Sequence, residues 1–403
     1  NFLMEQNMKI NPNSKWHQQT NIIHSGISRS QNNETSEPIY LTSGYIYKTA
    51  EEAESKFLGE REGFIYSRYG NPTVHSFETR LSDIEGCEKS IATSSGMSAV
   101  SSTLLSLLKS GDHIISSRAL FGSCRYVIED ILPKFGIEVT FIDGIDLDQW
   151  ETAMKSNTVC GFLESPSNPM LEICDINKIS QILHSNKAKL IVDNAFCTSI
   201  IQKPIQLGAD IVVYSATKHI DGQGRCLGGA VIGNEEFIEN TLRPFIRHTG
   251  PALSPFNAWV LNKGLETLEI RMEQHCKNAL KVAEELSKNK KINKIIFPGL
   301  PSHPQYDLIK NQMNNSGSII TFQVNGKKED TFNFLNNLDL IKISNNLGDS
   351  KSLITHPFTT THQRLSLVEK EKLGITDTVV RLSVGLENKN DILYDLQKSL
   401  ESI

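Results

Sequence analysis

The 403-residue chain contains no apolar stretch of the length that a membrane-spanning helix needs. Its seven scattered cysteines form no C-x-x-C pair and its eleven histidines form no cluster with them, which predicts reduced thiols and no metal site. The net charge of −5 supplies no basic field for nucleic acid, and the glycines at 222, 224, 228 and 229 do not fit a dinucleotide fingerprint. The polar segment 1–20 lacks a signal-type apolar core. These absences favour a cytoplasmic protein without a membrane or nucleic-acid partner.

The most informative motif is Ser215-Ala216-Thr217-Lys218, which follows the apolar run 211–214. A lysine that emerges from apolar surroundings has a lowered pKa, because burial destabilises the ammonium form and leaves a nucleophilic amine. The hydroxyls of Ser215 and Thr217 can hydrogen-bond a phosphate. This combination suits pyridoxal phosphate (PLP), which is held covalently by a lysine and anchored by its phosphate. Taken alone, such a motif more often marks an ordinary surface lysine at a strand end.

Three further positions with possible cofactor contacts follow apolar runs or begin helical patterns nearby. Asp193 ends the run 189–192, and an aspartate there can keep the pyridine nitrogen of PLP protonated. Gly96 and Met97 follow two serines at the start of a helical pattern, where free backbone N–H groups can hold an anion. The amide of Asn168 can donate to the phenolic oxygen of the cofactor. Each position alone also suits a helix cap or a turn, but together they favour a PLP site.

The pattern of apolar residues predicts an α/β protein. Helical patterns alternate with short apolar runs between residues 72 and 262, as a parallel sheet built from βαβ units requires. A long helical pattern runs from Phe256 to about Lys290, and strands and helices are mixed in the remainder. We expect an extended N-terminal arm over 1–70 that contacts other subunits, a cofactor-binding α/β domain over 71–262 and an α+β domain over 263–403.

The chain resembles the Cys/Met-metabolism (trans-sulfuration) family of PLP-dependent enzymes over nearly its whole length after about residue 20. The motifs that carry the resemblance are Tyr66-Ser67-Arg68-Tyr69-Gly70-Asn71-Pro72-Thr73, Ser95-Gly96-Met97, Ser215-Ala216-Thr217-Lys218-His219, Gly222-Gln223-Gly224-Arg225, Ser254-Pro255-Phe256-Asn257-Ala258-Trp259 and Val380-Arg381-Leu382-Ser383-Val384-Gly385. It implies fold type I, with a mostly parallel central sheet, helices on both of its faces and a smaller C-terminal α+β domain. It also implies a homotetramer, a dimer of dimers with shared active sites.

The resemblance assigns roles to several residues. Tyr66 and Arg68 would reach from the arm of one subunit to the cofactor phosphate of its neighbour. Arg381, inside the apolar run 379–384, would pair with the substrate α-carboxylate, although a structural ion pair with Asp or Glu is the alternative. Asn346 would border the substrate.

Phe121 stands where the lyases and cystathionine synthases of this family carry a tyrosine. Phenylalanine keeps the surface that stacks on the cofactor and lacks a proton to donate. A departing thiolate benefits from a proton because the pKa of a thiol is roughly 8.5, whereas a carboxylate with a pKa near ~4 needs none. Phe121 therefore favours an ester leaving group such as succinate. Drift at a packing position is the alternative reading.

We expect a γ-replacement in methionine biosynthesis, in which O-succinyl-L-homoserine and sulfide give L-homocysteine and succinate. Lys218 would bind the cofactor and then move protons as general base and acid. Cysteine as donor would need a second carboxylate site, for which the sequence shows no obvious extra arginine. The alternatives are a cystathionine γ-synthase, a methionine γ-lyase and, from a different class, a non-catalytic PLP-binding protein. The choice of succinyl over acetyl ester rests on resemblance alone.

Overall fold

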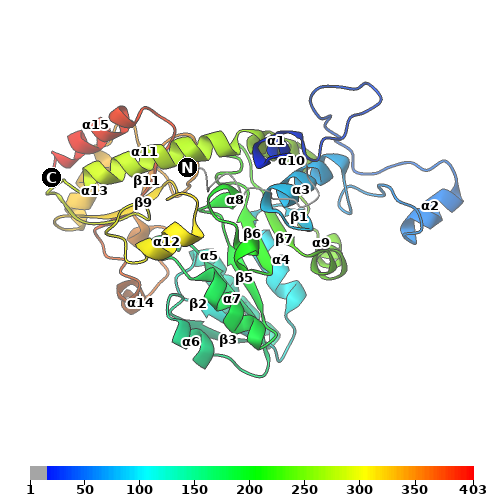
Figure 1. Ribbon diagram of the computed structural model, residues 1–403, viewed down its shortest axis with the longest axis horizontal. Helices are drawn as coiled ribbons and strands as arrows, with labels where there is room; N and C mark the ends of the chain where they lie inside the picture. Colours follow the sequence, from blue (N-terminus) through cyan, green and yellow to red (C-terminus); the bar gives the residue numbers. More distant parts are fainter. Residues whose placement is uncertain (1–15) are drawn as a thin grey trace. The chain divides into compact units, whose positions relative to one another are not determined.

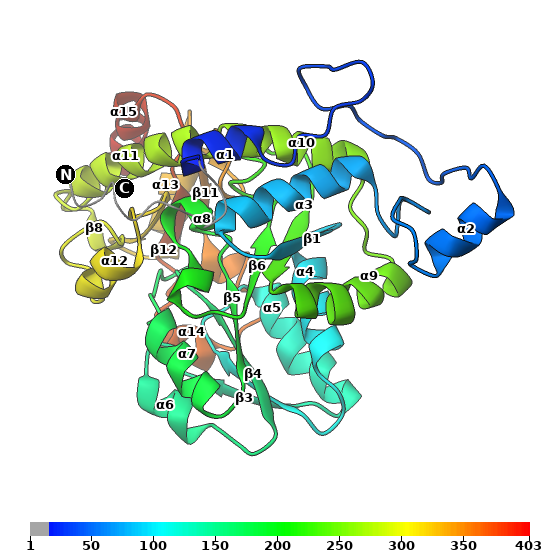
Figure 2. The same ribbon diagram turned by 45° about the vertical axis from the view of Figure 1, so that its right-hand side comes forward.

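The computed structural model describes residues 16–403, whose elements are labelled along the chain in Figures 1 and 2. Residues 1–15, which make up most of the polar segment 1–20, lie outside this range. The chain forms two compact units. The first comprises the described residues up to Leu107 with Val213–Thr217 and Arg225–Glu266, and the second comprises Leu108–Val212, Lys218–Gly224 and Thr267–Ile403. The domain boundaries at 70 and 262 stay a prediction.

The first unit combines helices with an antiparallel strand pair. Strand β1 pairs with β7 along its whole length, from Lys89 opposite Gly233 to Thr93 opposite Gly229. Helix α1 packs against α3 and α10, and the two views show it beside both (Figures 1 and 2). The elements are α1 (Gln18–His24), α2 (Ala50–Phe57), α3 (Pro72–Glu85), β1 (Lys89–Thr93), α4 (Gly96–Leu107), the part of β6 (Ile211–Ser215) from Val213 onward, β7 (Gly229–Gly233), η5 (Phe237–Leu242), α9 (Arg243–Thr249) and α10 (Pro255–Glu266).

Local sequence signals set the ends of α3. The Asn71 side chain accepts a hydrogen bond from the backbone N–H of Thr73 at 2.9 Å, and Pro72 occupies the first turn, where no N–H is needed. Gly86 ends the helix with φ of 76°, a conformation that glycine adopts without steric cost.

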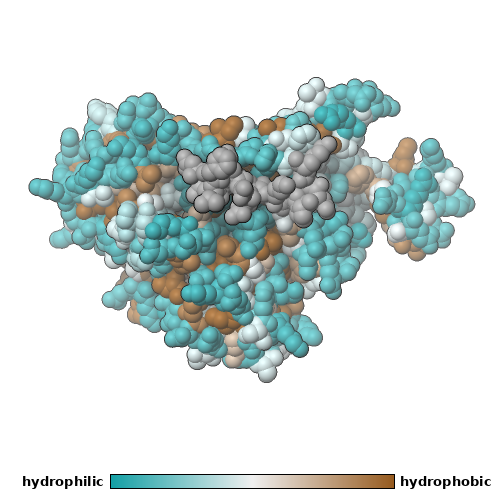
Figure 3. Space-filling model, in the orientation of Figure 1, coloured by the Kyte–Doolittle hydropathy of each residue, from teal (hydrophilic) through white to brown (hydrophobic). Residues whose placement is uncertain are grey.

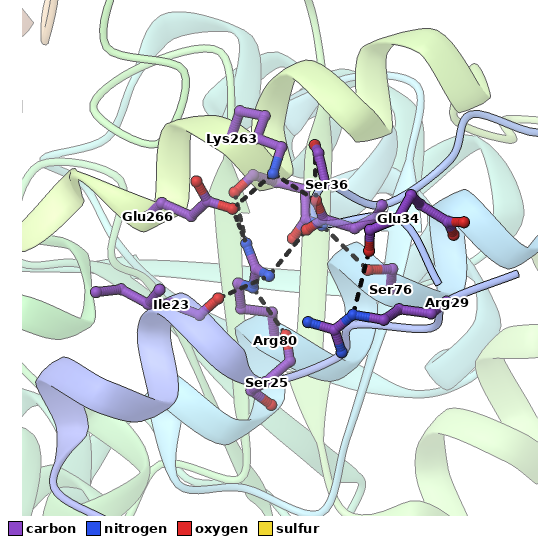
Figure 4. A network of polar contacts seen from close by, with 11 residues as sticks. Ile23, Ser25, Arg29, Glu34, Ser36, Ser76, Arg80, Lys263 and Glu266 are labelled. Atoms are coloured by element: carbon purple, nitrogen blue, oxygen red, sulfur yellow. Dashed lines mark hydrogen bonds and ion pairs between the residues drawn. The ribbon is translucent and has the colours of Figure 1, made fainter. Parts of the chain in front are cut away.

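A buried ionic network ties the segment after α1 to α3 and α10 (Figure 4). The fully buried guanidinium of Arg80 donates to the carbonyls of Ile23 at 3.2 Å and Ser25 at 2.8 Å, and to the carboxylates of Glu37 at 3.0 Å and Glu266 at 3.2 Å. Lys263 also contacts Glu37. A buried charge must be paired in this way, so the network fixes part of the arm onto the helices of its own unit.

The second unit contains a wholly parallel sheet in the order β5-β4-β2-β3. Strands β2, β4 and β5 are largely buried, as expected for a parallel sheet covered by helices, whereas the edge strand β3 is only partly buried. Helix α7 packs against β5. The elements of this part are β2 (His113–Ser117), α5 (Gly122–Tyr126), η2 (Val127–Ile131), η3 (Leu132–Phe135), β3 (Glu138–Ile142), α6 (Leu147–Thr152), β4 (Thr158–Glu164), α7 (Ile176–Ser185), β5 (Lys189–Asp193), α8 (Thr198–Ile201) and η4 (Pro204–Leu207).

A second sheet in the same unit has the order β10-β11-β12-β9-β8 and is antiparallel except for β10 and β11. Side chains of α11, α13 and α15 pack with those of β9 and β12 in one apolar cluster that includes Phe297, Phe322 and Phe334. The elements are α11 (Leu268–Leu286), β8 (Ile292–Ile296), α12 (Tyr306–Gln312), β9 (Ile319–Val324), α13 (Lys328–Asn336), β10 (Lys342–Ile343), β11 (Leu353–Thr355), η6 (Pro357–Thr359), α14 (Leu367–Lys372), β12 (Val379–Ser383) and α15 (Lys389–Leu400).

Two expectations from the sequence need correction. The single helix expected from Phe256 to about Lys290 is two helices, because Thr267 has φ of −111° and ψ of 7° and interrupts the pattern between α10 and α11. The arm is not extended throughout, since its described part contains α1 and α2. No helix within residues 16–403 combines the length and the apolarity that crossing a membrane requires.

Candidate active site

Lys218 follows β6 and directs its amine to a loop of the second unit. Its Nζ donates to the side-chain oxygen of Asn346 at 2.6 Å. Burial and the nearby Arg381 cation lower the pKa of Lys218 to about 8, against the opposing effect of Asp193. The lowered pKa leaves part of the Lys218 amine free, and Asn346 lies beside it; the predicted roles of the two residues toward cofactor and substrate stay predictions.

Two carboxyl groups end neighbouring strands of the parallel sheet. Glu164 at the end of β4 lies directly opposite Asp193 at the end of β5, and the edge formed by these strand ends is where ligands bind in α/β sheets. Burial raises the pKa of Asp193 to about 6, while a hydrogen bond from the backbone N–H of Ala195 and the Lys218 cation lower it. Burial and the Asp193 charge raise the pKa of Glu164 further, well above its usual range. Burial therefore favours the protonated form of both carboxyl groups.

Arg381 lies on β12 and is 2% exposed. Its guanidinium donates to the side-chain oxygen of Asn168 at 3.0 Å and to the carbonyls of Asn345 at 2.9 Å and Asn346 at 3.4 Å. Burial lowers the pKa of Arg381 to about 10, while the Glu164 charge raises it. Within the described residues no carboxylate forms an ion pair with Arg381, and its buried Nε has no hydrogen-bond partner. Arg381 therefore does not form the structural ion pair considered as the alternative, and its Nε remains available to donate to a substrate carboxylate.

A cavity of about 590 Å³ in the second unit has Phe121 and Lys218 in its wall. Phe121 precedes α5, and its backbone N–H donates to Glu164 at 2.8 Å. An apolar cluster of the same unit includes Ala119 and Leu347. Two arginines, Arg125 and Arg364, also line this cavity. The expectation that the chain offers no extra arginine for a second carboxylate is thus wrong.

The predicted phosphate-binding residues form a tight backbone cradle in the first unit. A Cβ atom placed on Gly96 would lie 2.6 Å from the Cβ and 2.8 Å from the Cα of Ser215, so only glycine fits between α4 and the end of β6. The Ser98 backbone N–H is capped by the Ser95 hydroxyl at 3.1 Å, and Met97 lies in the first turn of α4. A helix N-terminus that lies this close to serine hydroxyls is a typical anion-binding site.

Thr217 and the two arm residues also belong to the first unit. The Thr217 hydroxyl accepts from the backbone N–H of Gly228 at 3.0 Å, which fixes its direction. The guanidinium carbon of Arg68 lies 5.5 Å from the ring centroid of Tyr66 and 4.9 Å from that of Tyr69. The predicted role of Tyr66 and Arg68 toward a neighbouring subunit stays a prediction.

Sequence reasoning assigned no role to Glu164 or His362. The signal for Glu164 was present, since it ends an apolar strand just as Asp193 does. His362 is buried, and its Nε2 donates to the Asn168 carbonyl at 3.1 Å. Only the fold reveals this contact between distant parts of the chain.

The residues present fit PLP by their chemistry. The described atoms include a partly deprotonated lysine amine, two facing buried carboxyl groups at strand ends, a backbone cradle that a Cβ would fill and a buried arginine with an unused donor. These groups suit, in turn, the aldehyde, the pyridine nitrogen, the phosphate and an amino-acid carboxylate.

Comparison with known proteins agrees with this chemistry. Residues 19–401 match the model of the Cys/Met metabolism PLP-dependent enzyme family. An O-succinylhomoserine sulfhydrylase of Mycobacterium tuberculosis is 48% identical over 94% of each chain. An L-methionine gamma-lyase of Fusobacterium nucleatum is 44% identical over 95% of this chain and 98% of its own. A Campylobacter jejuni structure described as an O-acetylhomoserine (thiol)-lyase, with a pyridoxyl-lysine phosphate, is 34% identical, with a TM-score of 0.92 over 96% of this chain and 100% of its own. The predicted fold class is confirmed.

Proposed function

Since the chain belongs to the Cys/Met metabolism family of PLP-dependent enzymes, we propose that it converts O-succinyl-L-homoserine and sulfide into L-homocysteine and succinate, as a step of methionine biosynthesis. The observation that carries this proposal is Phe121 in the wall of the cavity that also contains Lys218. Phenylalanine offers a stacking face without a proton, which suits the departure of a carboxylate and not of a thiolate. The similarity to the sulfhydrylase of Mycobacterium tuberculosis supports the same reaction.

We assign the roles of the residues as follows. Bound PLP withdraws electrons from the substrate, which makes the protons on its Cα and Cβ acidic. Lys218 would hold the cofactor and, once freed, take the Cα proton on Nζ and exchange protons at Cβ. Arg381 would bind the α-carboxylate through its unused Nε and thereby orient Cα toward Lys218. Asp193 would keep the pyridine nitrogen protonated, and Asn168 would face the phenolic oxygen of the cofactor.

The phosphate would be held by the residues of the first unit. Gly96 and Met97 would offer backbone N–H groups, and Ser215 and Thr217 would offer hydroxyls, because Thr217 directly precedes Lys218 in the chain. We extend the proposal to Tyr66 and Arg68, which would bind the phosphate of a neighbouring subunit in a cytoplasmic homotetramer. Mixing inactive Lys218→Ala with inactive Arg68→Ala chains should restore activity in hybrid dimers, and no recovery after verified subunit exchange would refute shared sites.

Exposed apolar side chains in the arm support assembly with further copies of the chain. Ile46 is 96% exposed, Phe57 63% and Leu58 66%, and α2 contains no buried residue. In Figure 3 apolar atoms appear on the segment around α2, at the right edge of the view. Phe57 and Leu58 are neighbours in the chain, and large apolar side chains exposed next to one another favour an interaction surface.

The reaction is tested by product analysis with purified enzyme and PLP. O-succinylhomoserine should give homocysteine with sulfide faster than it gives cystathionine with an equal concentration of cysteine. Phe121→Tyr should leave this replacement largely intact and raise elimination from thioether substrates, because tyrosine restores a proton donor to the thiolate. Phe121→Leu serves as the matched control, since it changes the ring without adding a hydroxyl. Faster reaction with cysteine would instead identify a cystathionine γ-synthase, and methionine cleavage by the unmodified enzyme would identify a lyase.

A further inference from the structure

We propose that Arg364 binds the terminal carboxylate of the succinyl group and so selects the succinyl over the acetyl ester. This inference rests on the proposed function, because it concerns the acyl part of the same substrate. Arg364 lies in the wall of the cavity that contains Lys218 and Phe121. An O-succinyl ester carries a carboxylate at each end, and an acetyl ester lacks the one at the acyl end. An exposed cation in the cavity wall therefore distinguishes the two esters.

The other cations of the cavity are already engaged. Lys218 donates to Asn346. Arg125 forms a two-pronged contact with Glu129, at 2.7 Å and 3.2 Å, and also contacts Glu369. Arg364 is exposed, forms no ion pair with any described residue, and has its guanidinium carbon 5.6 Å from the ring centroid of Tyr126. It is the cavity-lining cation that remains available for a carboxylate, and its planar fork matches that group.

The acidic side chains of the cavity do not occupy Arg364. Glu129 and Glu369 are held by Arg125, and Glu369 also accepts hydrogen bonds from the backbone N–H and the hydroxyl of Ser366. Asp130 is exposed and forms no ion pair with a described residue. The charge of Asp130 would repel the acyl carboxylate, so removing this charge should have the opposite effect to removing the charge of Arg364.

The loop that carries Arg364 is fixed to the residues around Arg381. Burial lowers the pKa of His362 to about 4, so its ring is neutral, and Nε2 donates to the carbonyl of Asn168, whose side chain accepts from Arg381. On the other side of Arg364, the backbone N–H of Leu365 donates to the His362 carbonyl at 3.2 Å. Arg381, which is predicted to bind the α-carboxylate, and the loop that carries Arg364 are thus held by the same hydrogen-bond network. Such preorganisation is what a length-selective substrate site requires.

The test compares two esters with sulfide as the only sulfur donor, because sulfide brings no carboxylate of its own. Arg364→Leu should lower kcat/KM for O-succinylhomoserine by about fivefold, since an exposed arginine-carboxylate pair is lost, and should leave kcat/KM for O-acetylhomoserine within about twofold. Free succinate should lose inhibitory strength by a similar factor. Arg364→Lys should restore part of the effect, and Asp130→Asn should raise kcat/KM for the succinyl ester alone.

A matched control removes a cation from the same region without touching the cavity. Lys372 lies on α14 and does not line it, so Lys372→Ala should change neither ester. An equal loss with both esters after Arg364→Leu would show a general structural role and overturn the inference. An effect confined to reactions with cysteine would overturn it too, because Arg364 would then hold the donor. If the unmodified enzyme failed to act on the succinyl ester at all, the proposed function itself would fall, and this inference with it.

Discussion

The free amine of Lys218 is the property on which its proposed binding of the cofactor depends, and its pKa yields a prediction of definite sign. Burial and Arg381 lower the pKa from its ordinary value of 10.5 to about 8, whereas Asp193 raises it. At pH 7 a pKa of about 8 leaves roughly one amine in ten free, while a pKa of 10.5 leaves about three in ten thousand. The environment therefore increases the reactive fraction by about 300-fold.

The two neighbouring charges should shift this pKa in opposite directions. Arg381→Met removes a cation and should raise the pKa of Lys218, so its reactivity would appear only at higher pH. Asp193→Asn removes an anion and should lower the pKa, so that reactivity would appear at lower pH. Arg364→Leu changes a cation in the same cavity that does not perturb Lys218, and it should leave the midpoint in place.

Trace acetylation of the cofactor-free protein at a series of pH values measures this pKa. The fraction of labelled Lys218 is read by mass spectrometry of the digest, with the exposed Lys372 of the same sample as the reference for reagent reactivity. Labelling should rise with pH to a midpoint near 8 and level off above it. A midpoint near 10.5, or shifts of the same sign in the Arg381 and Asp193 variants, would refute the reasoning.

Two further predictions concern the first unit. Gly96→Ala should weaken PLP binding by at least about tenfold in equilibrium dialysis, because its Cβ would meet Ser215 at 2.6 Å. Gly44→Ala is the control, since its Cβ would have no neighbour closer than 4.0 Å. Equal affinity of the two variants for PLP would contradict the role of Gly96 in binding the phosphate. Arg80→Met should lower the free energy of unfolding by about 3 kcal/mol and reduce the urea midpoint, because Glu37 loses its buried partner. The exposed Lys310→Met should leave the midpoint unchanged, and a similar midpoint for both variants would show that the network does not stabilise the fold.

The sequence predicted the strands and the residues at their ends well, because a buried parallel strand is a short apolar run and its carboxyl end is where polar function begins. Asp193 and Lys218 follow this rule, since Asp193 ends β5 and Lys218 comes three residues after the end of β6. The sequence could not predict the break at Thr267, since the apolar pattern continues through it and the interruption is a matter of backbone dihedral angles. It also did not place Arg364 in the cavity of Lys218, because a loop far along the chain reaches that cavity only through the tertiary fold.

The same contacts link substrate binding to the chemistry of Lys218. Asn346 accepts from Lys218 through its side chain and from Arg381 through its carbonyl, so the two cations share one loop residue. Each cation disfavours the charged form of the other, and the Lys218 pKa is low partly for this reason. A substrate carboxylate on Arg381 would neutralise that cation, and the pKa of Lys218 would then rise. In the proposed reaction, a larger part of the amine would thus be free for the cofactor before substrate binds, and with the α-carboxylate in place Lys218 would be a stronger base for the Cα proton.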